Sequence, residues 1–227
     1  MNPKELVGRK AAEYVQDGMV VGLGTGSTAY WFVDEVGQRV KNGELPNIVC
    51  VPTSKQTEIQ ARELGIPLAQ LDEVNSIDLL VDGADECLRS MSVIKGGGGA
   101  HLIEKIVAEN SHEIIWIVTE EKVVDYLGAF PLPVEVIQTG SWNIFRAFEN
   151  AGMNPSFRKK GKDSLFVTDS GNYIIDLHLG RIDQPQQVAH ELKSMVGVVE
   201  HGLFINYPNR ILVAKNDGTV EVIEGQQ

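Results

Sequence analysis

The sequence predicts an α/β fold, with an open, mostly parallel, Rossmann-like sheet flanked by helices and a smaller α+β ferredoxin-like subdomain. Short apolar runs alternate with amphipathic stretches as far as Val118, as strands and helices do around a parallel sheet. The prolines of FPLPVEVIQ, at positions 131 and 133, then mark a boundary, and a βαββαβ-like order follows. Near the end of the chain, two β-type runs flank a hairpin turn signal.

The first part of the chain carries the pattern of a parallel sheet. The segment from Lys4 to Gln16 is amphipathic, whereas the next apolar run is short, ends in glycines and suits a buried parallel strand. Ser27 or Thr28 is expected to lie near the start of the second helix as its cap. We expect helices at residues 4–16, 27–41, 55–64 and about 100–109, and strands at residues 19–23, 47–51, 77–81 and 113–118.

The second part predicts a small subdomain and a returning tail. We expect strands at residues 134–138, 156–159 and 164–168, an extended run at 173–178, and helices at 141–150 and 185–195. From about Phe204 the chain is expected to return, because RILVA and VEVI flank the turn residues 216–219. The predicted divisions are therefore an α/β catalytic domain (1–131), the subdomain (132–203) and a C-terminal segment packed on the first domain (204–227).

Composition excludes several classes of protein. The 227 residues include 31 acids and 20 bases, and a formal charge of −11 argues against a general nucleic-acid binder. No stretch has the length of a membrane-spanning helix, and the charged N-terminal segment does not resemble a signal peptide, so a cytoplasmic protein without membrane contact is expected. Cys50 and Cys87 lie in no metal-like spacing and are expected to be reduced and structural.

The stretch VVGLGTGSTAYWF places three glycines between a predicted strand and a predicted helix. Glycines let backbone N–H groups approach a ligand, and a helix N-terminus favours negative charge. A dinucleotide or S-adenosylmethionine site would need an acid at the end of the next strand, where this chain has Val51, Pro52 and Thr53. A phosphate monoester needs only N–H groups and hydroxyls, so the loop favours phosphate over a nucleotide, with a plain turn as the simpler alternative.

The stretch VDGADECLRSMSVIKGGGGAHLIEK combines acids, a lysine and four glycines. Asp82 and Asp85 follow a predicted strand, at the edge where parallel sheets bind ligands. A simple turn needs fewer glycines than the run from Gly96 to Gly99, so we expect consecutive N–H groups to surround an oxyanion. With Lys95 as a cation and Glu104 as a base, these residues suit proton removal beside a carbonyl and stabilisation of the enediolate.

Four motifs in order, GLGTGSTA, DGADE, KGGGGAHLIEK and EKVVDYLGAFPLPVEV, closely resemble type A ribose-5-phosphate isomerases over essentially the whole chain. The resemblance implies interconversion of D-ribose 5-phosphate and D-ribulose 5-phosphate in the pentose phosphate pathway. It also implies a homodimer that uses no metal and no organic cofactor. One departure is Gly99, where the family often has alanine.

The resemblance also implies a role for individual residues. Glu104 would accept the proton, while Asp82 and Asp85 would assist ring opening and proton movement between O1 and O2. Lys95 and the glycines would stabilise the enediolate, Lys122 would contact substrate, and Lys4 would reach the phosphate. The full set of expected substrate-binding residues is Lys4, Thr25, Gly26, Ser27, Thr28, Asp82, Gly83, Ala84, Asp85, Lys95, Gly96, Gly97, Gly98 and Lys122.

Several alternatives stay open at this point. The function could instead be that of another sugar-phosphate isomerase, an amino-sugar phosphate isomerase–deaminase, or a sugar-phosphate sensor without turnover. His101 is expected to face solvent or a neighbouring loop at a helix start, and the run from Arg158 to Lys160 is expected to be a solvated hairpin or an interface. The segment PTSKQT, residues 52–57, either lines the pocket or caps a helix through Ser54.

Overall fold

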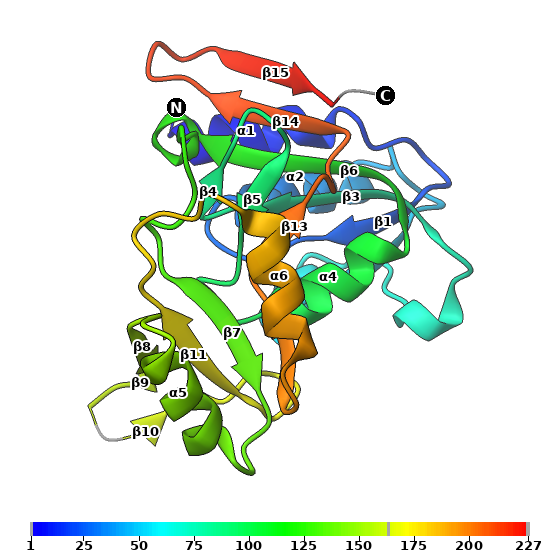
Figure 1. Ribbon diagram of the computed structural model, residues 1–227. Helices are drawn as coiled ribbons and strands as arrows, with labels where there is room; N and C mark the ends of the chain where they lie inside the picture. The colour runs from blue at the N-terminus through cyan, green and yellow to red at the C-terminus, as the bar shows by residue number, and fades with distance from the viewer. Residues whose placement is uncertain (1, 163, 226–227) are drawn as a thin grey trace.

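The computed structural model describes residues 2–162 and 164–225. The strands of its main sheet are β1 (Val20–Leu23), β2 (Val49–Pro52), β3 (Ile77–Gly83), β6 (Ser111–Thr119), β14 (Arg210–Ala214) and β15 (Val220–Glu224). They are ordered β15-β14-β6-β3-β1-β2, and only β15 runs antiparallel to its neighbour. The predicted parallel sheet and the returning hairpin are both confirmed (Figure 1).

Different elements cover the two faces of this sheet. The covering elements are α1 (Pro3–Ala12), α2 (Ala29–Lys41) and α3 (Lys55–Glu63) on one face, and α4 (His101–Glu109) with a three-stranded sheet of β4 (Glu86–Cys87), β5 (Ser92–Ile94) and β13 (Leu203–Ile205) on the other. Along β6, Ile115 and Ile117 pack toward the first face, whereas Trp116 and Val118 pack toward the second. Successive strand side chains point to opposite faces, so a strand covered on both faces is apolar throughout.

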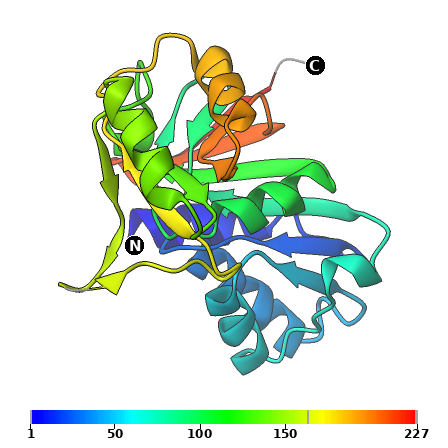
Figure 2. The same ribbon diagram turned by 60° about the horizontal axis from the view of Figure 1, so that its bottom comes forward.

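The small subdomain has its own sheet and core (Figures 1 and 2). Its elements are β7 (Leu132–Val136), α5 (Ser141–Asn150), β8 (Pro155–Phe157), β11 (Tyr173–Leu177), α6 (Pro185–Ser194) and β12 (Val198–His201), with a two-stranded β9 (Lys159–Lys160) and β10 (Ser164–Leu165) outside. The four main strands are antiparallel in the order β12-β7-β11-β8, which is the predicted βαββαβ arrangement. Two 3₁₀ turns complete the chain, η1 (Leu71–Glu73) and η2 (Glu120–Lys122).

Some predicted boundaries were wrong. The first helix ends at Ala12 rather than Gln16, because the chain tightens into short turns and reaches Gly18 with φ of 86°. The strand expected at 164–168 covers only Ser164 and Leu165. Strands β4, β5 and β13 were not predicted, because runs of two or three residues are too short to show a periodicity. The division of the chain at 131 and 203 remains a prediction.

Gly202 joins the subdomain to the catalytic part of the chain. It lies between β12 and β13, donates its N–H to Pro133 O at 2.8 Å and accepts the N–H of Lys95 at 2.8 Å. A Cβ atom here would lie 2.2 Å from the Lys95 carbonyl oxygen, so only glycine permits this approach. The returning chain thereby fixes the backbone of Lys95.

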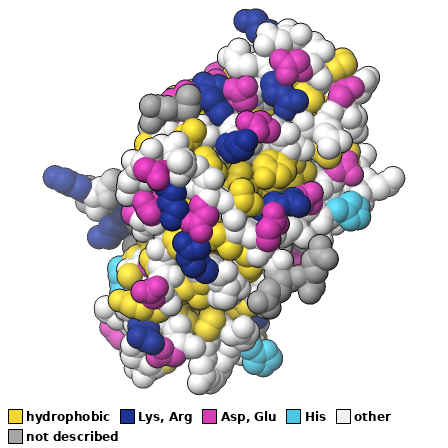
Figure 3. Space-filling view, turned by 90° about the horizontal axis from the view of Figure 1, so that it is seen from above, with side chains coloured by type: hydrophobic (Ala, Val, Ile, Leu, Met, Phe, Trp, Pro, Cys, Tyr) yellow, Lys and Arg dark blue, Asp and Glu magenta, His cyan; other side chains and the backbone are white. Residues whose placement is uncertain are grey.

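Charges on the surface are mixed. Figure 3, which views the molecule from the side of β15, shows basic and acidic side chains next to one another. Ion pairs such as Arg89–Glu221 and Lys215–Glu221, each with atoms 2.7 Å apart, lie at this edge. Within the described part of the chain, no helix has the length and apolar character needed to cross a bilayer.

Candidate active site

A cavity lies at the carboxyl ends of β1, β3 and β6. The loop after β1, the residues after β3, the glycine run before α4 and the start of α1 all line it. Every residue expected to bind substrate lines this cavity except Asp82, and Val118 and Thr119 line it in addition. Ligand sites at this edge are the rule in open parallel sheets, because the loops that follow the strands converge there.

Three charged side chains form a buried cluster at the base of the cavity. The Lys95 ammonium lies 3.0 Å from Asp82 Oδ2 and 3.3 Å from Glu104 Oε2, and it donates a hydrogen bond to the carbonyl of Gly83. Lys95, Asp82 and Glu104 are only 2%, 0% and 5% exposed. The indole of Trp116 lies 4.9 Å from the ammonium and adds a cation–π contact. One buried cation therefore serves two buried carboxylates.

This imbalance of charge shifts the pKa values of the cluster. Burial raises the pKa of Glu104 to about 8, and the negative charge of Asp82 adds to the shift while Lys95 opposes it. Burial also raises the pKa of Asp82 against the opposing charge of Lys95. Burial lowers the pKa of Lys95, but the charges of Asp82 and Glu104 outweigh it and raise the pKa above its usual value. Glu104 is thus suited to accept and return a proton near neutral pH.

Asp82 is oriented by the first glycine loop. Its Oδ1 accepts the N–H of Thr25 at 2.9 Å and the N–H of Gly83 at 2.7 Å. A Cβ atom on Gly24 would lie 2.3 Å from the same oxygen, so glycine is required for the loop to pass this close. The fully buried Asp82 therefore lies behind the cavity wall, where it binds the loop through Thr25 N–H and forms an ion pair with Lys95.

Hydroxyl groups of residues 52–57 support the first glycine loop. The Thr25 hydroxyl lies 2.8 Å from Ser54 Oγ and 3.1 Å from Thr57 Oγ1, and Thr57 donates to the Gly24 carbonyl at 2.9 Å. Ser54 also caps α3 by accepting the N–H of Thr57. The segment does not line the cavity among the described residues, so its cap interpretation is confirmed and its pocket interpretation is not.

The charged end of Lys4 meets the other side of the first glycine loop. Lys4 Nζ donates to Ser27 Oγ at 2.9 Å, and both residues line the cavity. Helix α2 begins at Ala29 with Thr28 as its N-cap, and the Thr28 side chain makes no capping hydrogen bond within the described chain. Thr28 is thus the N-cap residue, as expected, although its side chain does not cap the helix. The N–H groups of Tyr30 and Trp31 donate to Gly26 O and Thr28 O, whereas that of Ala29 has no acceptor among the described residues.

The run of four glycines does not present four equal N–H donors. Gly97 N–H donates to Asp85 Oδ2 at 2.8 Å, and Gly99 N–H donates to the Gly96 carbonyl at 3.0 Å. The N–H groups of Gly96 and Gly98 have no acceptor among residues 2–162 and 164–225. The cradle expected from the sequence is thus divided, with one donor holding Asp85 and two left unpaired.

The small subdomain packs against this run. A Cβ atom on Gly99, where φ is 82°, would lie 2.5 Å from the ring of Phe166. At the start of the run the close neighbour is His101 of α4, because a Cβ atom on Gly96, where φ is 104°, would lie 2.8 Å from His101 Nδ1. Gly99 is therefore a requirement of close packing and of a left-handed backbone, and not only a looser helix start.

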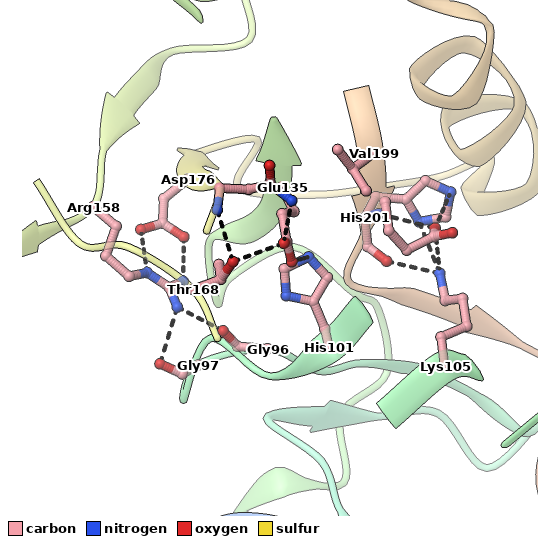
Figure 4. A network of polar contacts seen from close by, with 12 residues as sticks. Gly96, Gly97, His101, Lys105, Glu135, Arg158, Thr168, Asp176, Val199 and His201 are labelled. Atoms are coloured by element: carbon pink, nitrogen blue, oxygen red, sulfur yellow. Dashed lines mark hydrogen bonds and ion pairs between the residues drawn. The ribbon is translucent and has the colours of Figure 1, made fainter. Parts of the chain in front are cut away.

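Two sequence-based interpretations are corrected here. His101 is completely buried and faces the carboxyl group of Glu135, 3.9 Å away, instead of solvent. Burial lowers the pKa of His101 to about 3, so its ring is neutral. Arg158 is not solvated, since it donates to the carbonyls of Gly96 and Gly97 (Figure 4). Lys159 and Lys160 are exposed and pair in a hairpin with β10, as expected. The contacts of His101 with Glu135 and of Arg158 with the glycine run join residues far apart in the sequence, so a local sequence pattern could not predict them.

Glu86, the last residue of the DGADE motif, supports the cavity wall from behind. Its two carboxylate oxygens accept the N–H of Gly128 at 2.7 Å and of Phe130 at 2.6 Å. This fixes the segment that follows Lys122, a residue of the cavity wall whose ammonium lies 5.9 Å from the Phe130 ring. The position of Glu86 within the DGADE motif was the available signal.

A buried carboxylate with a raised pKa can remove and return a proton next to a carbonyl. The cation beside it and the unpaired N–H donors can stabilise the negative charge that forms on the oxygen. The fold and site therefore define a sugar-phosphate isomerase that works through an enediolate.

Comparisons with known proteins give the family. The sequence model of ribose 5-phosphate isomerase A (phosphoriboisomerase A) matches residues 49–218. Ribose-5-phosphate isomerase A of Streptococcus thermophilus (strain CNRZ 1066) is 54% identical over 221 residues, 97% of each chain. The ribose 5-phosphate isomerase structure from Plasmodium falciparum covers 99% of each chain at 36% identity with a TM-score of 0.94. The protein belongs to the ribose 5-phosphate isomerase A family.

A second solved structure carries a ligand. It is a D-ribose-5-phosphate isomerase in complex with phospho-erythronic acid, with a TM-score of 0.94 and 39% identity over 99% of this chain and 100% of that chain.

Replacement of Glu104 by glutamine should stabilise the protein at alkaline pH. The unfolded carboxyl group ionises near its ordinary pKa of 4.5, whereas the folded one ionises near 8. Wild-type stability therefore falls as pH rises from 4.5 to 8, and glutamine avoids this loss. We expect Glu104→Gln to raise the melting temperature at pH 9 by a few degrees and to change it little at pH 5, as followed by circular dichroism.

The exposed Glu149→Gln on α5 serves as the control, with the same small effect at both pH values. A lower melting temperature for Glu104→Gln at pH 9 would show that the ionised carboxylate stabilises the fold through Lys95.

Proposed function

We propose that the protein interconverts D-ribose 5-phosphate and D-ribulose 5-phosphate through an enediolate, with Glu104 as the catalytic base. The observation that carries this proposal is the buried Glu104, 3.3 Å from Lys95 and opening onto the cavity, with its pKa raised to about 8. An ordinary surface glutamate at a helix start would instead be solvated and unpaired.

The phosphate end of the substrate is proposed to lie at the first glycine loop. The N-terminus of α2, the hydroxyls of Ser27 and Thr28, and the ammonium of Lys4 converge there. The unpaired N–H group of Ala29 and the dipole of α2 favour a phosphate, and Lys4 adds a positive charge. Lys122 lines the same cavity and adds a second cation.

The proton transfer is proposed to run between the first two carbons of the sugar. Glu104 takes the proton from C2 of the open-chain aldose, and the electron pair forms the C1–C2 double bond while O1 becomes negative. The enediolate then loses its O2 proton as O1 gains one. Glu104 returns its proton to C1, which leaves the carbonyl at C2 and regenerates the carboxylate. No electrons are gained or lost overall.

The remaining groups are proposed to stabilise the intermediate. The ammonium of Lys95 and the unpaired N–H groups of Gly96 and Gly98 face the negative oxygens. Asp85 lines the cavity and is held by Gly97 N–H, so it is placed to move a proton between O1 and O2 and to assist ring opening. Asp82 does not line the cavity, so its proposed contribution runs through Lys95 and Thr25.

The ligand of the related structure supports this assignment. Phospho-erythronic acid carries a phosphate at one end and a planar carboxylate at the other, and a planar, negatively charged group resembles an enediolate. The alternatives left open by the sequence, a deaminase or a non-catalytic sensor, gain no support from relatives that are named ribose-5-phosphate isomerase A.

Two further properties are proposed, a homodimeric assembly and a cytoplasmic location. The homodimeric assembly rests on the resemblance of the sequence to this family, whereas the cytoplasmic location is the expectation drawn from the composition.

Glu104→Gln should abolish turnover while leaving binding intact. Glutamine keeps the shape of the side chain but cannot accept the proton, so we expect kcat to fall by about 10³-fold or more. The measurement is conversion of ribose 5-phosphate to ribulose 5-phosphate in the presence of a chelator, with phospho-erythronic acid binding followed by calorimetry. Equal turnover of mutant and wild type would transfer the role of base to Asp85.

The rate of the wild-type enzyme should depend on the ionisation of Glu104. Because only the carboxylate accepts a proton and its pKa lies at about 8, kcat/KM should rise with pH up to about 8 and level off above it. The slope of log kcat/KM against pH below 8 should approach 1. A profile that stays flat from pH 6.5 to 9 would mean that the base is fully ionised across this range.

Lys4→Met should weaken substrate binding more than it slows the chemistry. The variant loses a charged donor to the phosphate, so KM should rise by about 10-fold or more while kcat stays within about 3-fold. Lys10→Met, on the same helix and paired with Glu13 away from the cavity, is the matched control and should leave KM unchanged. A fall in kcat at constant KM would place Lys4 at the reacting end of the substrate.

A further inference from the structure

The guanidinium group of Arg158 reaches from the small subdomain to the glycine run of the active site. Arg158 lies between β8 and β9, and its Nη1 donates to Gly96 O at 2.6 Å and to Gly97 O at 3.1 Å. Figure 4 shows both carbonyl groups turned toward the guanidinium. One nitrogen atom therefore holds two consecutive peptide groups that are 62 and 61 residues away in the chain.

Asp176 on β11 fixes the guanidinium itself. Arg158 Nε donates to Asp176 Oδ2 at 3.0 Å, and Nη2 donates to Oδ1, so the pair is bidentate. The side chains of Arg158 and Asp176 are only 14% and 15% exposed. The backbone is held as well, since Arg158 N–H donates to Ile174 O at 2.9 Å. Because the pair is neutral as a whole, it orients the glycine run without adding a net positive charge beside Lys95.

A held carbonyl group also determines where the N–H group of its peptide points. The peptide unit is planar and almost always trans, so its C=O and N–H bonds point in opposite directions. The Gly96 carbonyl shares its peptide with Gly97 N–H, which points to Asp85 at 2.8 Å. The Gly97 carbonyl shares its peptide with Gly98 N–H, which has no acceptor within the described residues and belongs to a residue of the cavity wall.

Glycine peptides need such an external hold. Without a Cβ atom, glycine populates left-handed and right-handed conformations with similar ease, so a peptide between two glycines can rotate at small cost. A Cβ atom on Gly97 would meet the carboxyl group of Asp85 first, at 2.8 Å, and a Cβ atom on Gly98 would meet nothing within 4 Å. The Gly96 carbonyl also accepts the N–H of Gly99 at 3.0 Å, whereas the Gly97 carbonyl has no partner other than Arg158 among the described residues.

We propose that Arg158, held by Asp176, is a positioning residue for the reaction, which aims Gly97 N–H at Asp85 and Gly98 N–H at the negative oxygen of the intermediate. The inference rests on the proposed isomerisation through an enediolate. It assigns a catalytic contribution to the small subdomain, whose residues otherwise lie outside the cavity. If Arg158 served packing alone, its loss would lower stability and weaken substrate binding. If it orients an oxyanion donor, its loss would mainly reduce stabilisation of the intermediate.

The test compares Arg158→Met, Arg158→Lys and Asp176→Asn with the wild type. For each we would measure kcat and KM for ribose 5-phosphate, the inhibition constant of phospho-erythronic acid, and the melting temperature. We expect kcat of Arg158→Met to fall by about 10- to 100-fold, in line with the loss of one oriented oxyanion donor. The inhibition constant should rise by a similar factor, and KM should change by less than about 3-fold.

Arg158→Lys keeps the charge but not the fork that binds a carboxylate and two carbonyls together, so its kcat should lie between wild type and Arg158→Met. Asp176→Asn should reduce kcat in the same direction. Arg146→Met, an exposed arginine on α5 of the same subdomain, is the control and should match the wild type.

The outcomes are distinguishable. If the wild type does not convert ribose 5-phosphate, the proposed function fails. If it does, the inference is overturned by variants that keep kcat and only lose stability, or that raise KM as much as the inhibition constant. If Arg158→Met does not fold, the decision rests on Arg158→Lys, which must lower kcat and weaken the inhibitor together for the inference to stand.

Discussion

The buried ammonium group of Lys95 is the constraint on which the site depends. A charge out of water is costly unless partners satisfy it, and here Asp82, Glu104 and the Gly83 carbonyl surround it. The two carboxylates exceed the single cation, so one of them has to be a weak acid. Asp82 accepts two backbone N–H groups that help to hold its charge beside Lys95, whereas burial raises the pKa of Glu104 to about 8.

The elements around this cluster are held from outside the cavity. Helix α4, which carries Glu104, is anchored by its neighbour Lys105, whose ammonium donates to the His201 carbonyl at 2.7 Å (Figure 4). The same ammonium donates to Glu200 at 2.8 Å and to the Leu203 carbonyl at 2.9 Å. Burial lowers the pKa of Lys105 to about 8. Gly202 adjoins these carbonyls and holds the backbone of Lys95. The chain that leaves the small subdomain thus fixes the backbone of Lys95 and the helix that carries Glu104, as the proposed mechanism requires.

Elements with a long periodic pattern could be predicted from the sequence. The buried parallel strands, the helices and the hairpin at 216–219 all appear where the pattern placed them, within a few residues. The short strands β4, β5 and β13 could not, because two or three residues carry no periodicity. His101 and Arg158 were misjudged for a different reason. A histidine at a helix start and a basic run in a hairpin are usually solvated, and only the packing of the subdomain on the glycine run changes that.

By itself the sequence determined the chemistry that is available: apolar strands that end in glycines, two aspartates after a strand, and a lysine, four glycines and a glutamate in succession. Local residue types suffice for this, because strand ends, tight turns and ionisable groups are properties of short segments. The tertiary structure decided which groups act on one another. It made Glu104 a weak acid by burying it beside Asp82, and it brought Arg158 to Gly96 across 62 residues. Burial and long-range distances are set by packing, which no short segment contains.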